Sequence, residues 1–141
     1  MKKVIMVGID GLGAHYLSAA HAPFLHSLFG EGTYCKNMQS VLPAVSGPNW
    51  MSLITGVGPD KHGVVNNSPK PNREHSTVFK ELHDAYPDEK NLSLFYSWTP
   101  FGRLVEPELH KGKNNVVSCW RDTVVLNRVM KDIKEEQARV T

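Results

Sequence analysis

Two oxygen-bearing side chains in the first third of the chain have the chemistry for nucleophilic attack on phosphorus. Asp10 follows an apolar run, and Ser46 lies at or just before the start of a predicted helix. A serine oxygen at a helix amino terminus faces unpaired backbone N–H groups and the positive end of the helix dipole, which favours an alkoxide and binds phosphate oxygens. Metal coordination is one route to activate such a hydroxyl, and Asp10 offers a hard oxygen ligand for the metal.

Each of these residues also has an ordinary structural interpretation. An Asp after a strand commonly forms a turn or caps a helix. A Ser at a helix start commonly accepts a hydrogen bond from a backbone N–H two or three residues on. It is the combination of Asp10 with Ser46 that favours a catalytic role over two unrelated caps.

The first part of the chain predicts elements that would carry both residues to one place. Residues 4–9 form a continuous apolar run, typical of a strand buried on both faces of a parallel sheet. A helix is predicted at residues 23–29, and an extended segment at residues 33–41. Ligands bind beyond the carboxyl ends of strands in such sheets. We therefore expect Asp10 and Ser46 at the same sheet edge.

The rest of the chain continues to alternate helices and strands. We expect a helix from Ser46 to Gly56, a loop at residues 57–75, a helix at 76–86, a strand at 92–98, a short helix from Thr99, a strand at 116–120 and a last helix capped by Asp122. The apolar residues expected to face inward are Trp50, Leu53 and Ile54, then Val78, Phe79, Leu82 and Tyr86, then Val125, Val129, Met130 and Ile133. The alternation predicts an α/β fold, a mostly parallel sheet flanked by helices.

Composition limits the remaining possibilities. The chain has 141 residues, 40% of them apolar, and a net charge of +2, which suits one domain and gives no nucleic-acid-binding footprint. We expect no membrane span, because no long apolar run occurs. The apolar start is too short for a signal peptide, so we expect a cytoplasmic protein; an exported protein trimmed of its leader would show the same start. Cys35 and Cys119 have no metal-ligand spacing and are expected to be buried thiols rather than a disulfide.

Three segments resemble the type I phosphodiesterase/nucleotide pyrophosphatase family of the alkaline phosphatase superfamily. Residues 7–11 (VGIDG) resemble its first metal-ligand motif. Residues 42–50 (LPAVSGPNW) resemble its nucleophile segment, in which Thr or Ser precedes a Pro-Asn pair. Residues 55–68 (TGVGPDKHGVVNNS) resemble the stretch that follows. The three segments occur in the family's order, and the resemblance covers about residues 4–68.

The resemblance implies a role for each matching residue. Asp10 would ligate one of two zinc ions, and Ser46 would bind zinc through its oxygen and attack phosphorus, giving a phosphoseryl intermediate. The backbone N–H of Gly47 and the side chain of Asn67 would hold a non-bridging phosphate oxygen of a small-molecule phosphate ester. His62 would support the loop rather than bind metal. Asn49 would be a helix-start residue rather than a substrate contact.

The sequence also departs from the family pattern. The family's downstream Asp and His ligands are not found, and one Asp with one Ser cannot fill two zinc shells. We therefore expect residues 1–141 to be the amino-terminal part of one alkaline phosphatase-like domain, weak in metal binding and inactive alone. A sulfatase is disfavoured, because Trp50 stands where its modification site needs Arg.

Three alternatives stay open. The parent enzyme could be a phosphomonoesterase or a phosphonate hydrolase of the same superfamily. The chain could instead be a degenerate domain that only binds a phosphate or a partner.

An incomplete sheet would also expose strand edges, so self-association is expected.

Overall fold

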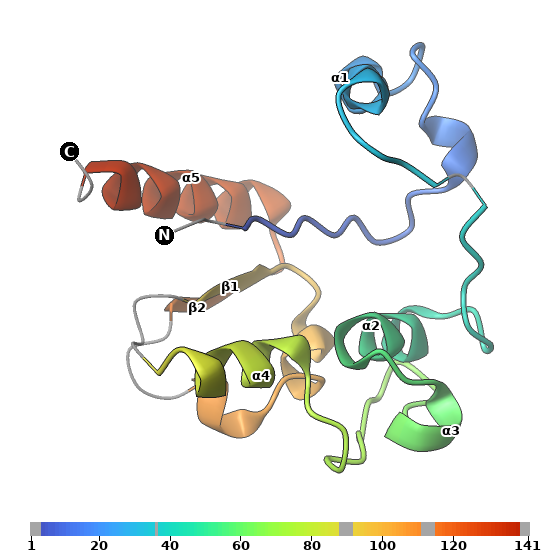
Figure 1. The fold of residues 1–141 in the computed structure, drawn as a ribbon, viewed down its shortest axis with the longest axis vertical. Coiled ribbons are helices and arrows are strands. Elements are labelled where there is room, and N and C mark those ends of the chain that lie inside the picture. Colours follow the sequence, from blue (N-terminus) through green and yellow to red (C-terminus); the bar gives the residue numbers. More distant parts are fainter. Residues whose placement is uncertain (1–3, 36, 88–91, 111–114, 139–141) are drawn as a thin grey trace. The chain divides into compact units, whose positions relative to one another are not determined.

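The computed structural model describes residues 4–35, 37–87, 92–110 and 115–138. The chain divides into two compact units, Met1–Gln39 and Ser40–Thr141. The first contains η1 (Ala14–Tyr16), α1 (Pro23–Ser27) and η2 (Leu28–Gly30), where η denotes a 3-10 helix (Figure 1). The second contains α2 (Ser46–Thr55), α3 (Pro59–His62), α4 (Val78–Ala85), β1 (Ser93–Tyr96), η4 (Thr99–Arg103), η5 (Pro107–His110), β2 (Asn115–Ser118) and α5 (Asp122–Ala138).

The amino-terminal unit confirms one predicted element and corrects another. The helix predicted at residues 23–29 is present as α1 and η2, and it begins at Pro23, whose fixed φ suits a first helical position. The buried strand predicted at residues 4–9 is wrong. These residues form no ladder in the structure, and their side chains are exposed, from 53% for Ile9 to 91% for Val4. A strand is buried only where neighbours pair with it, and the described residues of this unit contain no other strand.

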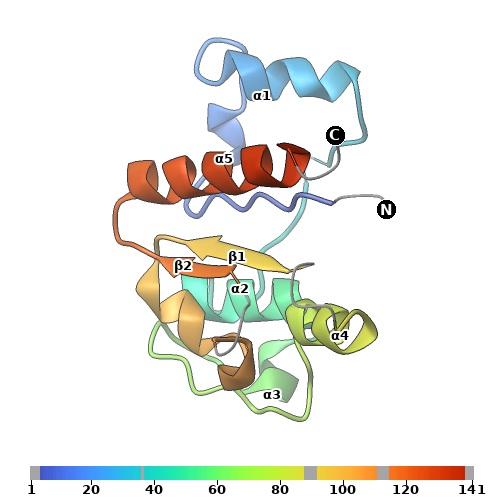
Figure 2. The ribbon, with the colours of Figure 1, turned by 90° about the vertical axis from the view of Figure 1, so that its left-hand side faces the viewer.

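The second unit contains the parallel sheet that the alternating pattern predicts. Strands β1 and β2 pair in parallel, with Leu94 opposite Val116 and Tyr96 opposite Ser118. Helix α5 lies over one face of this sheet, and α2 and α4 lie on the other (Figure 2). The observed strands are shorter than the predicted ones, at residues 93–96 and 115–118. The α/β class, with helices on both sides of a parallel sheet, is confirmed, whereas residues 33–41 form no strand where they are described.

The core of the second unit gathers around one aromatic side chain. Phe101 contacts the rings of Trp50, Phe79 and Tyr96, with centroids 5.5, 6.3 and 5.4 Å away. These rings come from α2, α4 and β1, so all three elements contact Phe101 of η4. The fully buried aliphatic side chains of Leu104, Val105 and Leu109 come from the same stretch of chain.

Two predicted inward faces need correction. On α2 the buried apolar residues are Met51 and Ile54, while Leu53 is 52% exposed. The predicted stripe lies to one side of the observed one, whose buried residues are Gly47, Pro48, Met51 and Ile54. On α4 only Phe79 packs against the core, and Val78, Leu82 and Tyr86 are exposed.

The polar residues that connect the loops explain where two elements begin and end. Thr77, rather than Ser76, caps α4, because its Oγ1 accepts from the Lys80 N–H at 3.3 Å. The buried Glu106 carboxylate accepts from both the N–H (2.8 Å) and the Oγ1 (2.6 Å) of Thr77. The guanidinium of Arg73 donates to three successive carbonyls, those of Arg103, Leu104 and Val105. Together these bonds fix the loop before α4 to the segment after η4.

Two further observations concern expectations from composition. Both cysteines are free thiols, but Cys35 is exposed and Cys119 only half-buried, so the expected burial is wrong. Within the described ranges, no helix has the length and apolar content to cross a bilayer.

Candidate functional site

The predicted nucleophile is the first residue of α2. Val45 precedes it in an extended conformation and holds the N-cap position without a side-chain hydrogen bond. Pro48, in the first turn, has no N–H to leave unpaired. The helix ends at Gly56, whose φ of +73° is the left-handed conformation that glycine adopts without strain. Ser46 therefore lies at a helix amino terminus, as predicted.

The hydroxyl of Ser46 is not used as a cap. Among the described residues, neither its Oγ nor its backbone N–H has a hydrogen-bond partner, and the residue is half-buried. The cap interpretation required this oxygen to accept an N–H of the first turn. The Ser46 N–H is a further donor that the sequence motifs did not indicate. The signal for it was Pro48, which removes one of the few other donors of the first turn.

Gly47 and Asn67, both predicted to bind phosphate, meet directly. The N–H of Gly47 donates to Oδ1 of Asn67 at 2.8 Å. Because a backbone N–H needs an oxygen acceptor, this bond fixes which way the amide group is turned. The other end of the amide, Nδ2, has two donor hydrogens and no acceptor among the described residues. Asn67 is exposed, so these hydrogens can reach a ligand from solvent.

The close contact between helix and loop also requires a glycine. An added Cβ on Gly47 would lie 2.1 Å from the carbonyl oxygen of Asn66 and 3.3 Å from Oδ1 of Asn67. Asn66 itself forms a local turn, because its Oδ1 accepts the Ser68 N–H at 2.8 Å. Residues 66–68 are therefore held against the start of α2.

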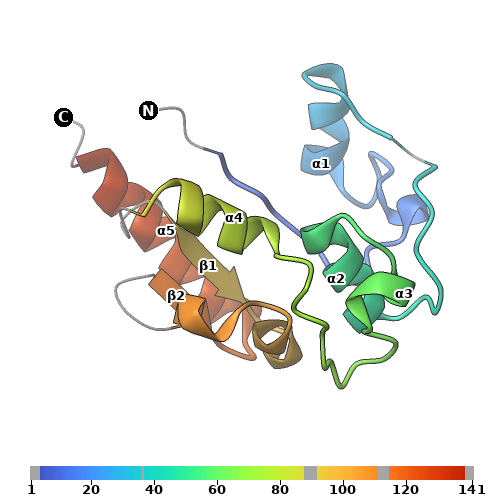
Figure 3. The same cartoon turned by 60° about the horizontal axis from the view of Figure 1, so that its bottom comes forward.

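His62 supports this loop, in agreement with the role that the resemblance implies. Its ring is fully buried at the end of α3, which lies beside α2 (Figure 3). Nδ1 accepts the Val64 N–H at 3.1 Å, so Nε2 carries the proton and donates to Oγ of Ser52 at 2.9 Å. Burial lowers the pKa of His62, and Asp60 partly opposes the shift. Both ring nitrogens are occupied by protein groups.

The structure also corrects the predicted loop at residues 57–75, since α3 lies within it.

Asp10 belongs to the amino-terminal unit, where it is exposed in a turn. The next residue, Gly11, has a φ of +72° and provides the left-handed step of that turn. Within the described residues, no three or more His, Cys, Asp or Glu side chains form a group that could hold a metal ion. These residues alone do not fit two zinc shells, and the pairing of Asp10 with Ser46 at one metal stays a prediction.

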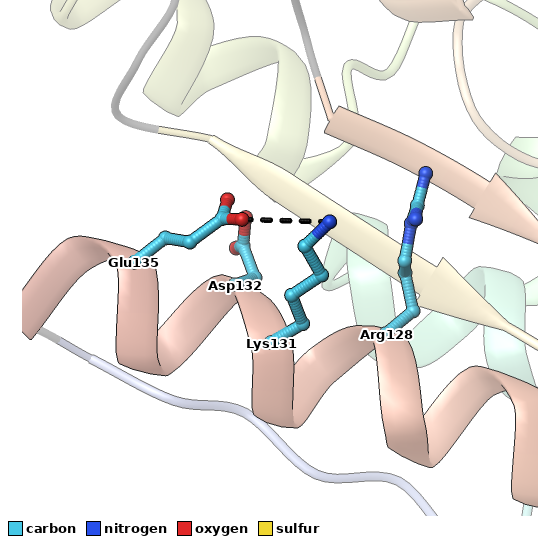
Figure 4. Close-up of a pocket in the computed structure, with 4 residues that line it drawn as sticks. All are labelled: Arg128, Lys131, Asp132 and Glu135. Carbon is cyan, nitrogen blue, oxygen red and sulfur yellow. Dashed lines mark ion pairs between the residues drawn. The ribbon is translucent and has the colours of Figure 1, made fainter.

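A hollow on the surface of α5 does not offer a second catalytic site. Its lining consists of Arg128, Lys131, Asp132 and Glu135, all from one helix (Figure 4). Lys131 and Glu135 pair at 3.5 Å across one turn, an exposed i, i+4 ion pair of ordinary kind. Two acidic and two basic side chains on one helix face are typical of a solvated surface.

Ser46 thus opens α2, and Asn67 is hydrogen-bonded to Gly47 beside it. Comparison with known proteins shows the family. A model of the type I phosphodiesterase / nucleotide pyrophosphatase family matches residues 4–129, and the chain belongs to this family.

Several curated relatives are similar to the chain. A bis(5'-adenosyl)-triphosphatase, ENPP4, of Homo sapiens is 33% identical over 123 residues, which is 87% of this chain and 25% of that protein. Ectonucleotide pyrophosphatase/phosphodiesterase family member 1 of Rattus norvegicus is 37% identical over 82 residues, 55% of this chain and 9% of that protein. The chain thus spans a quarter or less of these relatives. No solved structure matches it significantly.

Proposed function

We propose that this chain carries the nucleophile of a phosphoric ester hydrolase, and that Ser46 is the attacking residue. The observation that supports this most directly is the unused hydroxyl of Ser46 at the start of α2, beside an asparagine amide with two free donor hydrogens. Attack of Oγ on phosphorus forms an Oγ–P bond and breaks the bond to the leaving oxygen. The serine proton goes to solvent or a base, and hydrolysis of the phosphoseryl group then regenerates the hydroxyl.

The same geometry supports a division of work among the neighbouring groups. In this proposal Nδ2 of Asn67 and the N–H of Ser46 donate to a non-bridging phosphate oxygen, where negative charge builds up during transfer. The N–H of Gly47, predicted to touch phosphate itself, is engaged with Asn67 and acts by holding that amide in place.

Zinc is part of the proposal for the whole protein only. Asp10 and Ser46 are the two oxygen donors that this chain would contribute, and bound zinc would activate the nucleophile and stabilise charge on oxygen. The described residues contain no group of three or more His, Cys, Asp or Glu side chains that could supply the further ligands. We therefore assign to the chain itself the orientation of Ser46 and the binding of phosphate oxygens.

The proposed substrates are small phosphate esters or anhydrides. Relatives are named for nucleotide pyrophosphatase and bis(5'-adenosyl)-triphosphatase activities, which favours dinucleoside polyphosphates and other diesters as first substrates to try. A cytoplasmic location is proposed on the sequence alone, and cell fractionation with an antibody to the chain tests it.

The decisive experiment uses the full-length natural protein with zinc and two chromogenic substrates, bis(p-nitrophenyl) phosphate and p-nitrophenyl phosphate. We expect diester hydrolysis that Ser46→Ala abolishes, and a phosphoryl group trapped on the Ser46 peptide in mass spectra of acid-quenched protein. Ser76→Ala, at an exposed serine without a described partner, is the matched control. Preference for the monoester would favour the phosphomonoesterase alternative. Turnover that is independent of Ser46 would refute the proposal.

A further inference from the structure

Asn49 lies in the first turn of α2, yet its side chain bonds to the chain that precedes the helix. Oδ1 accepts the N–H of Val41 at 2.9 Å. Nδ2 donates to the carbonyl of Val45 at 2.9 Å, with the carbonyls of Val41 and Pro43 at 3.4 and 3.5 Å. We call residues 41–45 the approach segment. One amide group thus serves both ends of the approach segment as donor and acceptor.

This arrangement matters because the approach segment is otherwise poorly held. It contains no strand, and Leu42 and Val45 are exposed. Among the described residues, its other backbone hydrogen bonds are local, from the Val45 N–H to the Pro43 carbonyl (2.8 Å) and from the Asn49 N–H to the Val45 carbonyl (3.4 Å). An extended, exposed segment with few hydrogen bonds opens readily. The Asn49 side chain therefore supplies the main restraint on the five residues that lead into Ser46.

The restraint acts on the nucleophile through the peptide bond. Nδ2 of Asn49 holds the carbonyl of Val45, and the same peptide group contains the N–H of Ser46. The peptide plane is rigid, so fixing that carbonyl also fixes the direction of the Ser46 N–H and the starting point of its side chain. On the other side, the Gly47–Asn67 bond fixes the next peptide. Ser46 lies between two anchored peptide planes.

We propose that Asn49 is a positioning residue for Ser46: it holds the approach segment so that Oγ and the N–H of Ser46 are aligned for attack, without touching substrate. This inference rests on the proposed role of Ser46. It differs from a purely stabilising cap, which would lower the folded fraction without changing the geometry of the molecules that stay folded.

The first measurement uses the 141-residue chain and needs no activity. Amide hydrogen exchange and ¹⁵N–¹H spectra are compared for the natural chain, Asn49→Ala and Asn49→Asp, under conditions in which all are folded. We expect faster exchange at Val41 and shifted signals at Ser46 and Gly47. Asn49→Asp retains an acceptor for Val41 but lacks the donor to Val45, so it should restore protection at Val41 only. Asn127→Ala, an exposed asparagine on α5, is the matched control.

The second measurement is steady-state hydrolysis by the full-length natural protein. A misplacement of about 1 Å lowers rates by about a hundredfold, so we expect kcat to fall by about that factor in Asn49→Ala. KM should stay within about twofold, because Asn67 still binds phosphate. Asn49→Asp should resemble Asn49→Ala, since the donor to Val45 is the group that aligns Ser46. Asn127→Ala should match the natural protein.

The outcomes separate the two proposals. If Ser46→Ala abolishes turnover but Asn49→Ala keeps kcat, the positioning role is overturned and the proposed function stands. Unchanged signals at Ser46 and Gly47 in folded Asn49→Ala would overturn it as well. If Ser46→Ala remains active, both proposals fail together.

Discussion

Nε2 of His62 lies 2.9 Å from Oγ of Ser52, and this bond joins the loop after α2 to the helix that begins with Ser46. The opposite ring nitrogen accepts the N–H of Val64 at 3.1 Å. Protonation would turn that acceptor into a second donor facing a donor. The ring is also buried, so both effects favour its neutral form.

Acid should therefore weaken the fold through His62. The pKa of His62 is lowered in the folded chain, mainly by burial, so its contribution is complete above the ordinary value of 6.5. The contribution is lost as the pH falls below that value, because the unfolded chain then binds the proton more readily. We expect the free energy of unfolding, from urea titrations, to decrease between about pH 7.5 and 5.

The matched variant for this experiment is His62→Gln, which keeps a donor but does not titrate. Its stability is expected to be lower at neutral pH and to depend less on pH over the same range. The substitution His110→Gln, at an exposed histidine, should leave the natural slope unchanged. If the free energy of unfolding changed equally with pH in the natural chain and in His62→Gln, the role given to His62 would be contradicted.

Gly47→Ala should disturb the site strongly, although it adds only one methyl group. The new methyl group would meet the carbonyl oxygen of Asn66 at 2.1 Å unless the loop moves. Overpacking of this kind costs about 1–3 kcal/mol, and loss of the Gly47–Asn67 bond should change the side-chain amide signal of Asn67. Gly30→Ala is the control, since nothing lies within 4 Å of its added Cβ. A stable Gly47→Ala with the natural Asn67 signal would show that the contact is not needed.

The substitution Arg73→Lys should not preserve the hydrogen bonds that the arginine makes. The planar guanidinium spans the carbonyls of Arg103, Leu104 and Val105 at 2.7–3.1 Å, and one ammonium cannot reproduce that fork. We expect Arg73→Lys and Arg73→Ala to lose stability by about 2–3 kcal/mol in urea unfolding. The exposed Arg128→Lys should be near neutral. Full stability in Arg73→Lys would mean that one carbonyl contact suffices.

The chain alone should show no catalysis by Ser46. Asp10 and Ser46 are the two metal donors that the motif resemblance assigns to this chain, and zinc catalysis needs about three protein ligands for each ion. With zinc added, we expect bis(p-nitrophenyl) phosphate hydrolysis to be equal in the 141-residue chain and in its Ser46→Ala variant. Robust, zinc-dependent and Ser46-dependent turnover would contradict this prediction.

Self-association is the remaining expectation from the fold. In the described part of the chain, β1 and β2 pair only with each other, so each has an open edge. Open edges favour pairing between molecules. Sedimentation velocity should show a mean mass that rises with protein concentration, and a constant monomer mass over that range would exclude it.

The sequence predicted the local elements of the second unit well, because their signals are local. Proline and glycine mark the two ends of α2, and the short helix from Thr99 follows the turn signal of Thr-Pro. The strand at residues 4–9 failed for the opposite reason. An apolar run records a tendency to be buried, whereas pairing and burial depend on partner strands elsewhere in the chain.

The sequence singled out the candidate site residues, but not the contacts between them. The motif resemblance singled out Ser46, Gly47 and Asn67, and the structure brings these three together. The resemblance could not show that the Gly47 N–H bonds to the side chain of Asn67, or that the side chain of Asn49 accepts the N–H of Val41. Such contacts are decided by loop conformation over eight to twenty residues, beyond the range of a periodic pattern.

The boundary between Gln39 and Ser40 divides the predicted chemistry between two pieces of polypeptide. Every hydrogen bond described around Ser46 lies within residues 40–141, and Asp10 lies outside them. A gene cut at this point would keep the nucleophile's surroundings intact on one product and put the candidate metal carboxylate on the other.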